Sequence, residues 1–198
     1  MSLLLESIKI LNGKLYNMTL HEQRANRSRK MLFGIERPLY LKKVIVVPEE
    51  FKKGLVKCRV IYGESIESVI FTMYEKRKIN SAKVIYEDHV LYDHKYVIRT
   101  GLDDVYAKRE DHDEIIIIKN GMVTDAYYFN LVFEKEGKYF TSDTPLLHGI
   151  QREKLILSQK VQEIPIHLDD ISSYERVHFV NALNPLGRNV LEVAQISF

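Results

Sequence analysis

The chain alternates between apolar runs of strand length and polar stretches rich in charge or turn residues. The first run, residues 3–18, is interrupted at Asn12-Gly13, a pair that strongly favours a two-residue hairpin turn. We therefore predict two strands joined at this pair. Further apolar runs predict strands before the middle of the chain, at residues 41–47, 54–63 and 67–74.

One helix is predicted between the first hairpin and the next strand. Thr19 is followed three residues later by Glu22, which is the spacing of a capping box at a helix start. Gly34 comes after the last helix-forming residue and is typical of a helix end. The polar stretch between these signals therefore predicts a helix that stops near Gly34.

The second half of the chain contains more hairpin signals. Asn120-Gly121 and Glu136-Gly137 each separate two apolar runs, so each pair predicts a turn between strands. Gly101 lies within the helix predicted over residues 94–110 and weakens that prediction. The other predictions are strands at residues 82–88 and 163–168, two strands within 178–193, and helices over 94–110, 149–160 and 169–177.

The order of these elements predicts the fold class. Helices and strands are mixed and many strands are joined by hairpins, which indicates a mixed α/β or α+β fold with strongly curved sheets. The polar stretch TMYEKRKINS interrupts the apolar pattern. We place a linker there, at residues 74–78, between an N-terminal α/β domain over residues 1–73 and a larger C-terminal domain over residues 79–198.

Composition narrows the class of protein. The 198 residues are 45% hydrophobic and 28% charged, and a formal net charge of +2 gives no general case for nucleic acid or a membrane as partner. No stretch reaches the roughly 18 apolar residues of a membrane span, and a basic signal-peptide region is missing. The one cysteine, Cys58, lies in an apolar run where packing explains it, so we expect a cytoplasmic protein.

Two side chains in the second half could carry chemistry. Lys95 has apolar neighbours and Arg99 nearby, surroundings that lower a lysine pKa and make the amine a nucleophile; a solvated lysine on a helix is the alternative. Asp125 lies in a strand-like aromatic run and could bond a protonated heterocyclic nitrogen, or its own backbone. Pyridoxal 5′-phosphate requires both groups, an acid for its ring nitrogen and a lysine for its aldehyde.

A phosphate could bind where the helix near residue 149 begins. Gly149, Ile150 and Gln151 would present unpaired N–H groups at a helix start, and Arg24 on the first predicted helix could add a guanidinium fork. An ordinary helix start and a solvated arginine are the alternatives. The histidines show no recognised zinc spacing, so we expect no metal site.

In their order along the chain these residues resemble the fold-type IV pyridoxal-phosphate enzymes, the family of branched-chain and D-amino-acid aminotransferases and 4-amino-4-deoxychorismate lyase. The resemblance extends from about Leu5 to Leu191, and His21 with Arg24 matches the family's HxxR helix. It implies two domains, a small N-terminal α/β domain and a larger C-terminal domain with a curved, barrel-like sheet. The matching segments are ESIKILNGKLYNMTLHEQR, HKYVIR, DEIIIIKNGMVTDAYYFNLVF, TPLLHGIQREKLI and FVNALNPL.

The resemblance implies a role for each matched residue. Lys95 is implied as the lysine that attaches the cofactor and moves the substrate Cα proton. Asp125 is implied as the partner of the ring nitrogen, at a position where the family usually has glutamate. Because the expected substrate is anionic, Arg99 or another nearby cation is expected to hold a substrate carboxylate. The implied cofactor-binding residues are Arg24, Lys95, Asp125, Asn130, Gly149, Ile150, Gln151 and Asn181.

Within the family, the lyase branch matches best. The Lys95–Arg99 spacing and the NALNP strand are similar to 4-amino-4-deoxychorismate lyase, which implies formation of 4-aminobenzoate and pyruvate for folate synthesis. An amino-acid aminotransferase with the same site is the alternative, and a non-catalytic relative is a third. The resemblance also implies a small, anionic, amino-acid-like substrate and a homodimer.

Three departures from the family pattern bear on the choice of substrate and on activity. The chain starts after the family's usual first strand and loop. The aspartate at position 125 is shorter than the family's glutamate. The segment between Thr144 and Gly149 is also short, which trims a loop that often shapes the substrate pocket.

Overall fold

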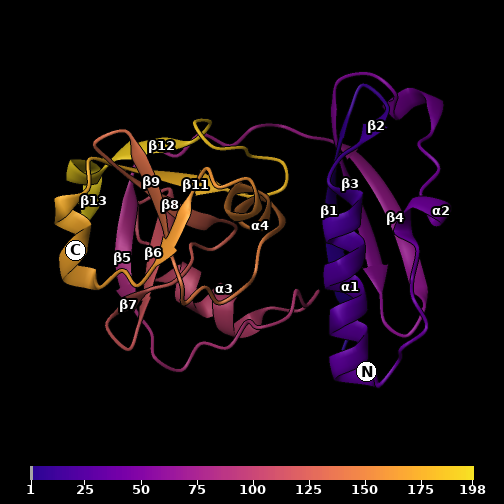
Figure 1. Ribbon diagram of the computed structural model, residues 1–198, viewed down its shortest axis with the longest axis horizontal. Helices are drawn as coiled ribbons and strands as arrows, with labels where there is room; N and C mark the ends of the chain where they lie inside the picture. The colour runs from indigo at the N-terminus through magenta and orange to yellow at the C-terminus, as the bar shows by residue number, and fades with distance from the viewer. Residues whose placement is uncertain (1) are drawn as a thin grey trace. The chain divides into compact units, whose positions relative to one another are not determined.

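The computed structural model describes residues 2–198, and the chain divides into two compact units (Figure 1). The first unit contains the residues up to Lys76 together with His94–Ile98, and the second contains Arg77–Asp93 and Arg99–Phe198. Residues 74–81 form neither helix nor strand. Both the unit boundary and the linker expected from the sequence lie within this stretch.

An antiparallel sheet of four strands forms the centre of the first unit, in the order β2-β1-β3-β4. Asn12 and Gly13 both have positive φ, as a type I′ turn requires, which confirms the first predicted hairpin. The strands are β1 (Leu4–Leu11), β2 (Lys14–Leu15), β3 (Leu55–Tyr62) and β4 (Ile66–Met73).

Helix α1 (Met18–Phe33) packs against one face of this sheet. Its Ala25 lies in one apolar cluster with Leu4 and Ile8 of β1, because every second residue of a strand points to the same face. Cys58 of β3 is fully buried in this cluster, and burial raises the pKa of its thiol to about 12, so its predicted packing role is confirmed. Two short helical segments complete the unit, α2 (Leu41–Val44) and Glu49–Phe51.

The two ends of α1 differ in how well the sequence predicts them. Gly34 has a φ of 68°, the left-handed conformation that ends a helix, as predicted. The helix begins at Met18 after Asn17, and no side chain caps its first turn. The predicted capping role of Thr19 is therefore wrong, because Thr19 already lies inside the helix.

Residues 94–98 run alongside strand β1. The Leu5 N–H donates to the Lys95 carbonyl at 2.9 Å, and Leu4 forms a bridge with Tyr96. Because the backbone of this segment pairs with a strand, the helix predicted from His94 is wrong. Helix α3 begins only at Thr100 and ends at Ala107.

Two sheets form the second unit, one of five strands in the order β10-β9-β8-β11-β12 and one of four in the order β13-β5-β6-β7. The fold is thus mixed α/β with several sheets, as predicted. The predicted barrel is wrong, because neither sheet closes on itself among residues 2–198. The strands are β5 (Ala82–Tyr86), β6 (Glu114–Lys119), β7 (Met122–Val123), β8 (Asn130–Lys135), β9 (Lys138–Ser142), β10 (Gln162–Ile164), β11 (Arg176–Val180), β12 (Val190–Glu192) and β13 (Ile196–Ser197).

Apolar side chains from both sheets form the core of the second unit. Val84 and Ile116 of the four-stranded sheet lie in one cluster with Phe133 of the five-stranded sheet. Helix α4 (Ile150–Leu157) covers the other face of the five-stranded sheet, where its Leu155 clusters with Val132. Strand β8 is therefore buried on both faces, which fixes the positions of the polar side chains at its start.

Both hairpin turns predicted for the second unit are present. Asn120-Gly121 and Glu136-Gly137 have positive φ at every residue, as at the first hairpin. The helix predicted over residues 169–177 is wrong in extent, because only a 3-10 segment, Leu168–Ser173, precedes β11. A further 3-10 segment, Val193–Gln195, leads into β13.

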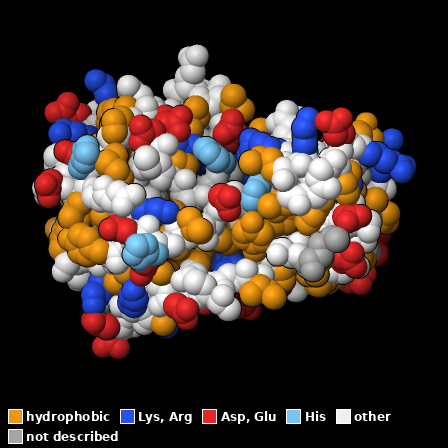
Figure 2. Space-filling view, turned by 90° about the horizontal axis from the view of Figure 1, so that it is seen from below, with side chains coloured by type: hydrophobic (Ala, Val, Ile, Leu, Met, Phe, Trp, Pro, Cys, Tyr) orange, Lys and Arg blue, Asp and Glu red, His pale blue; other side chains and the backbone are white. Residues whose placement is uncertain are grey.

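The surface carries charges of both signs. On the face shown in Figure 2, acidic and basic side chains are interspersed with apolar ones, in keeping with a formal net charge of +2. Between residues 2 and 198 no helix combines the length and the apolar character needed to cross a membrane.

Candidate active site

A buried ion cluster lies where helix α1 packs on strand β1. The Glu6 carboxylate is fully buried and accepts hydrogen bonds from Arg24 Nε at 2.9 Å and Arg24 Nη2 at 2.5 Å. His21 Nδ1 lies 2.6 Å from the same carboxylate. Glu6 occupies an inward position of β1, and residues three apart share one face of a helix, so the three side chains meet.

The electrostatics of this cluster fix its protonation. Burial alone would raise the pKa of Glu6, but Arg24 and His21 outweigh burial and hold the pKa at about 2. Burial lowers the pKa of His21, so the neutral ring donates its Nδ1 proton to Glu6. His21 Nε2 is then an acceptor, and it has no hydrogen-bond partner among residues 2–198.

The bidentate bond orients the Arg24 guanidinium. Arg24 Nε and Nη2 face Glu6, so the N–H groups of Nη1 point away from that carboxylate. An arginine held in this way keeps a positive charge while its orientation is fixed by a buried partner. This is a suitable arrangement for binding an anion such as a phosphate.

Lys95 belongs to the same unit as this cluster. Its carbonyl accepts the N–H of Leu5, the residue next to Glu6, and its charge contributes to the lowered pKa of His21. The structure therefore brings Lys95, His21 and Arg24 into one region. Glu6 was given no role by sequence reasoning, although a charged residue at an inward strand position indicates a buried partner.

A second buried carboxylate, Asp125, lies in the second unit just after β7. Its Oδ1 accepts a hydrogen bond from Asn130 Nδ2 at 2.7 Å, and its Oδ2 accepts one from the Leu147 N–H at 2.8 Å. Both of these donors are neutral. Burial therefore dominates and raises the pKa of Asp125 to about 6, well above its ordinary value.

Asn130 connects Asp125 to the loop that leads into α4. Its Nδ2 also donates to the Leu147 carbonyl at 2.8 Å. Position 149 accepts only glycine, because a Cβ there would lie 1.8 Å from Asn130 Oδ1. The amide of Asn130 thus positions both the carboxyl group of Asp125 and the turn at Gly149.

Helix α4 begins directly after this turn. Gly149 is its N-cap in extended conformation, and Ile150 and Gln151 are buried in the first turn. The first N–H groups of a helix have no partner within the helix, which is why sequence reasoning assigns them to a phosphate. The structure places Gly149 beside Asn130, which donates to Asp125, and Ile150 and Gln151 follow Gly149 in the first turn of α4.

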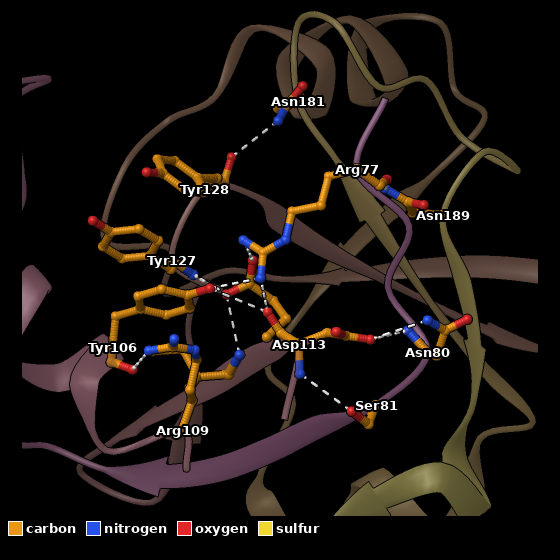
Figure 3. A network of polar contacts seen from close by, with 12 residues as sticks. Arg77, Asn80, Ser81, Tyr106, Arg109, Asp113, Tyr127, Tyr128, Asn181 and Asn189 are labelled. Carbon is orange, nitrogen blue, oxygen red and sulfur yellow. Dashed lines mark hydrogen bonds and ion pairs between the residues drawn. The ribbon is translucent and has the colours of Figure 1, made fainter. Parts of the chain in front are cut away.

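The two remaining predicted residues lie beside a pair of tyrosines in the second unit. Arg99 Nη1 donates to the Tyr127 carbonyl at 3.4 Å. Asn181 Nδ2 donates to the Tyr128 carbonyl at 3.2 Å (Figure 3). Asn181 Oδ1 also accepts the N–H groups of Leu183 and the residue after it. In this structure the Asn181 amide therefore holds a turn and the backbone of Tyr128.

Comparison with known sequences identifies a family. The sequence profile of the amino-transferase class IV family matches residues 80–196, which is more than half of the chain. An uncharacterised protein of Haemophilus influenzae is 35% identical over 185 residues, which cover 92% of this chain and 98% of that protein.

Solved structures show the same fold. The crystal structure of a candidate 4-amino-4-deoxychorismate lyase from Haemophilus somnus is 31% identical with a TM-score of 0.85, and the match covers 93% of this chain and 98% of that chain. The form of a hypothetical aminotransferase from Mycobacterium tuberculosis with bound pyridoxal phosphate shares the fold, with 14% identity and a TM-score of 0.77 over 98% of this chain and 81% of that chain.

The Glu6→Gln variant tests the buried cluster. It leaves the Arg24 charge buried without its counter-ion, so we expect the free energy of unfolding to fall by about 3 kcal/mol at pH 7 in urea. The wild-type contribution should be present above about pH 4 and lost as pH falls towards the Glu6 pKa of about 2. Glu49→Gln is the matched control, because Glu49 forms an exposed ion pair with Lys52 at 2.6 Å. This substitution should lower the free energy of unfolding by less than about 0.5 kcal/mol. Equal losses in both variants would contradict the account.

The raised pKa of Asp125 predicts a pH dependence of stability in the protein freed of cofactor. The folded state keeps the Asp125 proton up to about pH 6, whereas the unfolded chain releases it near about pH 3.9. The stability of the wild type relative to Asp125→Asn should therefore fall as pH rises from 4 to 7, by up to about 3 kcal/mol. Urea unfolding at several pH values measures this slope, and a constant difference between the two proteins would exclude a raised pKa.

Proposed function

The chain belongs to the amino-transferase class IV family, and we propose that it is a pyridoxal 5′-phosphate-dependent lyase converting 4-amino-4-deoxychorismate into 4-aminobenzoate and pyruvate. Enzymes of this family depend in general on that cofactor. The similarity over nearly the whole chain to a candidate lyase of this reaction carries the choice of lyase. The products would supply folate synthesis.

The donors around Asp125 fit the ring nitrogen of the cofactor. Asn130 and Leu147 supply only neutral donors, which leaves the buried carboxyl with a raised pKa of about 6. A protonated ring nitrogen is a cation, and its approach would favour the carboxylate and lower that pKa. Aspartate can therefore serve where the family usually has glutamate, because Asn130 holds it in place.

Arg24 and the first turn of α4, each taken by itself, have the chemistry of a phosphate-binding group. Arg24, oriented by Glu6, supplies a fixed cation, and the first turn of α4 supplies backbone N–H groups from Ile150 and Gln151. Gly149 keeps that turn close to Asn130. Asn181 would act indirectly, through the backbone of Tyr128.

Lys95 would perform the proton transfers. Its amine would hold the cofactor and, once released by the substrate amine, would act as a base. When bound, pyridoxal phosphate withdraws electrons from the substrate carbon that carries the amine. Lys95 Nζ takes the proton from this carbon, the C–O bond to the enolpyruvyl group breaks, and the ring becomes aromatic. Protonation of the released enolpyruvate gives pyruvate.

An amino-acid aminotransferase is the second candidate, because the matching profile is that of the amino-transferase class IV family. The two reactions share removal of the Cα proton and differ in the fate of that proton. In a transferase, Lys95 would return the proton, and a 2-oxo acid would accept the amine as second substrate. The groups around Asp125 and Lys95 serve both reactions.

The reaction is tested with purified protein loaded with pyridoxal phosphate. We expect pyruvate release from 4-amino-4-deoxychorismate, and a loss of about 100-fold or more in Lys95→Ala, because the base is missing. Lys78→Ala, an exposed lysine in the stretch before β5, is the control and should keep full activity.

The outcomes separate the candidates. Borohydride reduction and subsequent mass spectrometry should locate the cofactor on Lys95. Stoichiometric amino transfer to 2-oxoglutarate, without pyruvate release from aminodeoxychorismate, would select the transferase. A protein that neither binds the cofactor nor turns over either substrate would overturn the proposal. The homodimer implied by the resemblance stays a prediction, which sedimentation velocity can test.

A further inference from the structure

Arg99 is enclosed by aromatic rings in the second unit. The centre of its guanidinium lies 4.3 Å from the ring centroid of Tyr127, 4.7 Å from that of Tyr128 and 6.0 Å from that of Tyr92. Cations are attracted to the faces of aromatic rings, and the side chain of Arg99 is only 13% exposed. The three tyrosines therefore hold a charged group in a largely desolvated place.

The described polar contacts of Arg99 do not include a close ion pair. Its contacts with the Tyr127 carbonyl and Asp103 are long, at 3.4 Å and 3.7 Å, and Tyr92 adds a neutral hydrogen bond. Asp103 is half exposed and also accepts the Tyr127 hydroxyl at 2.6 Å. A guanidinium has five donors arranged as a fork, so Arg99 has the capacity to bind a further carboxylate.

The tyrosines around Arg99 are fixed from behind. Tyr127 stacks on Tyr106 with ring centroids 3.9 Å apart and planes 7° apart, and Arg109 lies 4.4 Å from the ring of Tyr106 (Figure 3). The Tyr127 N–H donates to fully buried Glu114 at 3.2 Å. This ladder pre-organises the ring on which Arg99 rests, which lowers the entropy cost of binding a ligand there.

Tyr128 gives the site its shape. Its ring stands at 63° to that of Tyr127 and its side chain is half exposed, while Asn181 holds its backbone carbonyl. A flat ligand could therefore stack on Tyr128 while its carboxylate reaches the Arg99 fork. An aliphatic 2-oxo acid would use the fork but not the ring.

We propose that Arg99 and Tyr128 form the recognition site for a carboxylate carried on a planar or nearly planar six-membered ring. This inference rests on the proposed function and deepens it, because the ring carboxylate of aminodeoxychorismate and of 4-aminobenzoate has this chemistry. Arg99 and Tyr128 determine specificity in this account, and Asp125 and Lys95 carry the cofactor and the proton.

The test compares two probes that differ only in the carboxylate, 4-aminobenzoate and aniline, by equilibrium dialysis against the purified protein. We expect wild type to prefer 4-aminobenzoate by about tenfold or more, because a charge-assisted fork stabilises the carboxylate. Arg99→Met should abolish the preference. Arg99→Lys, which keeps the charge but loses the fork, should reduce it severalfold. Tyr128→Leu should weaken the binding of both probes to a similar degree, because it removes the ring on which they stack.

Arg109→Met is the matched control. Arg109 stacks on the far side of the same ladder, on Tyr106, so its loss should leave the preference unchanged. An unchanged preference in Arg99→Met and Arg99→Lys would overturn the proposal, even if both variants unfold at lower temperature, because Arg99 would then act only in folding. If Arg99→Met does not fold, Arg99→Lys decides alone.

The same samples separate this proposal from the proposed function. Cofactor content, read from the visible absorbance band, should be equal in wild type and the Arg99 variants. A protein without cofactor that still prefers 4-aminobenzoate would contradict the lyase assignment and support the recognition site. A protein that binds the cofactor but does not prefer 4-aminobenzoate over aniline would support the lyase assignment and contradict the recognition site.

Discussion

A carboxyl group that is buried among neutral donors is the constraint on which the second unit's site depends. Asp125 is 5% exposed, and its described hydrogen bonds come from an amide side chain and a backbone N–H. These donors satisfy the geometry of a carboxylate but supply no full positive charge. This environment suits the role proposed for Asp125, because a protonated pyridine nitrogen would bring a cation to the carboxylate.

The contrast with Glu6 shows that the chain can compensate a buried carboxylate when it needs to. Glu6 is equally buried, but a bidentate arginine and a histidine hold its pKa at about 2. Within residues 2–198 Asp125 has no such pair, and its pKa is raised to about 6. The Glu6 carboxylate thus orients Arg24, and we propose that the Asp125 carboxylate binds a cationic ligand. The two carboxyl groups therefore differ in pKa because their surroundings differ.

Sequence reasoning predicts the local features well and the long-range ones poorly. The turns at Asn12-Gly13 and Asn120-Gly121 are predictable because the turn type demands positive φ, which these residues tolerate. The segment at His94 is predicted to be helical but pairs with β1. Strand β1 lies near the start of the chain, far from this segment in the sequence. Tertiary pairing of this kind overrides local preference and leaves no local signal.

The same division holds in the candidate site. Asp125 stands out in the sequence as a poor strand residue in an aromatic run, but its donor Leu147 acts through the backbone, so its side chain gives no signal. The closeness of Gly149 to Asn130 likewise depends on packing that only the structure shows. The ladder of Tyr106, Tyr127 and Arg99 joins a helix to the loop before β8, which no motif predicts.

The central claim is that Asp125 is the acid partner of a cationic ring. Carbon-13 NMR of carboxyl-labelled protein, with Asp125→Asn to assign the signal, measures its pKa directly. The account predicts a pKa of about 6 in the protein freed of pyridoxal phosphate. Loading the cofactor should lower it by about 1 to 3 pH units, because an opposite charge then lies beside the carboxylate. An Asp125 signal that titrates near the ordinary value of about 3.9 without cofactor, or that does not respond to cofactor, would contradict the account.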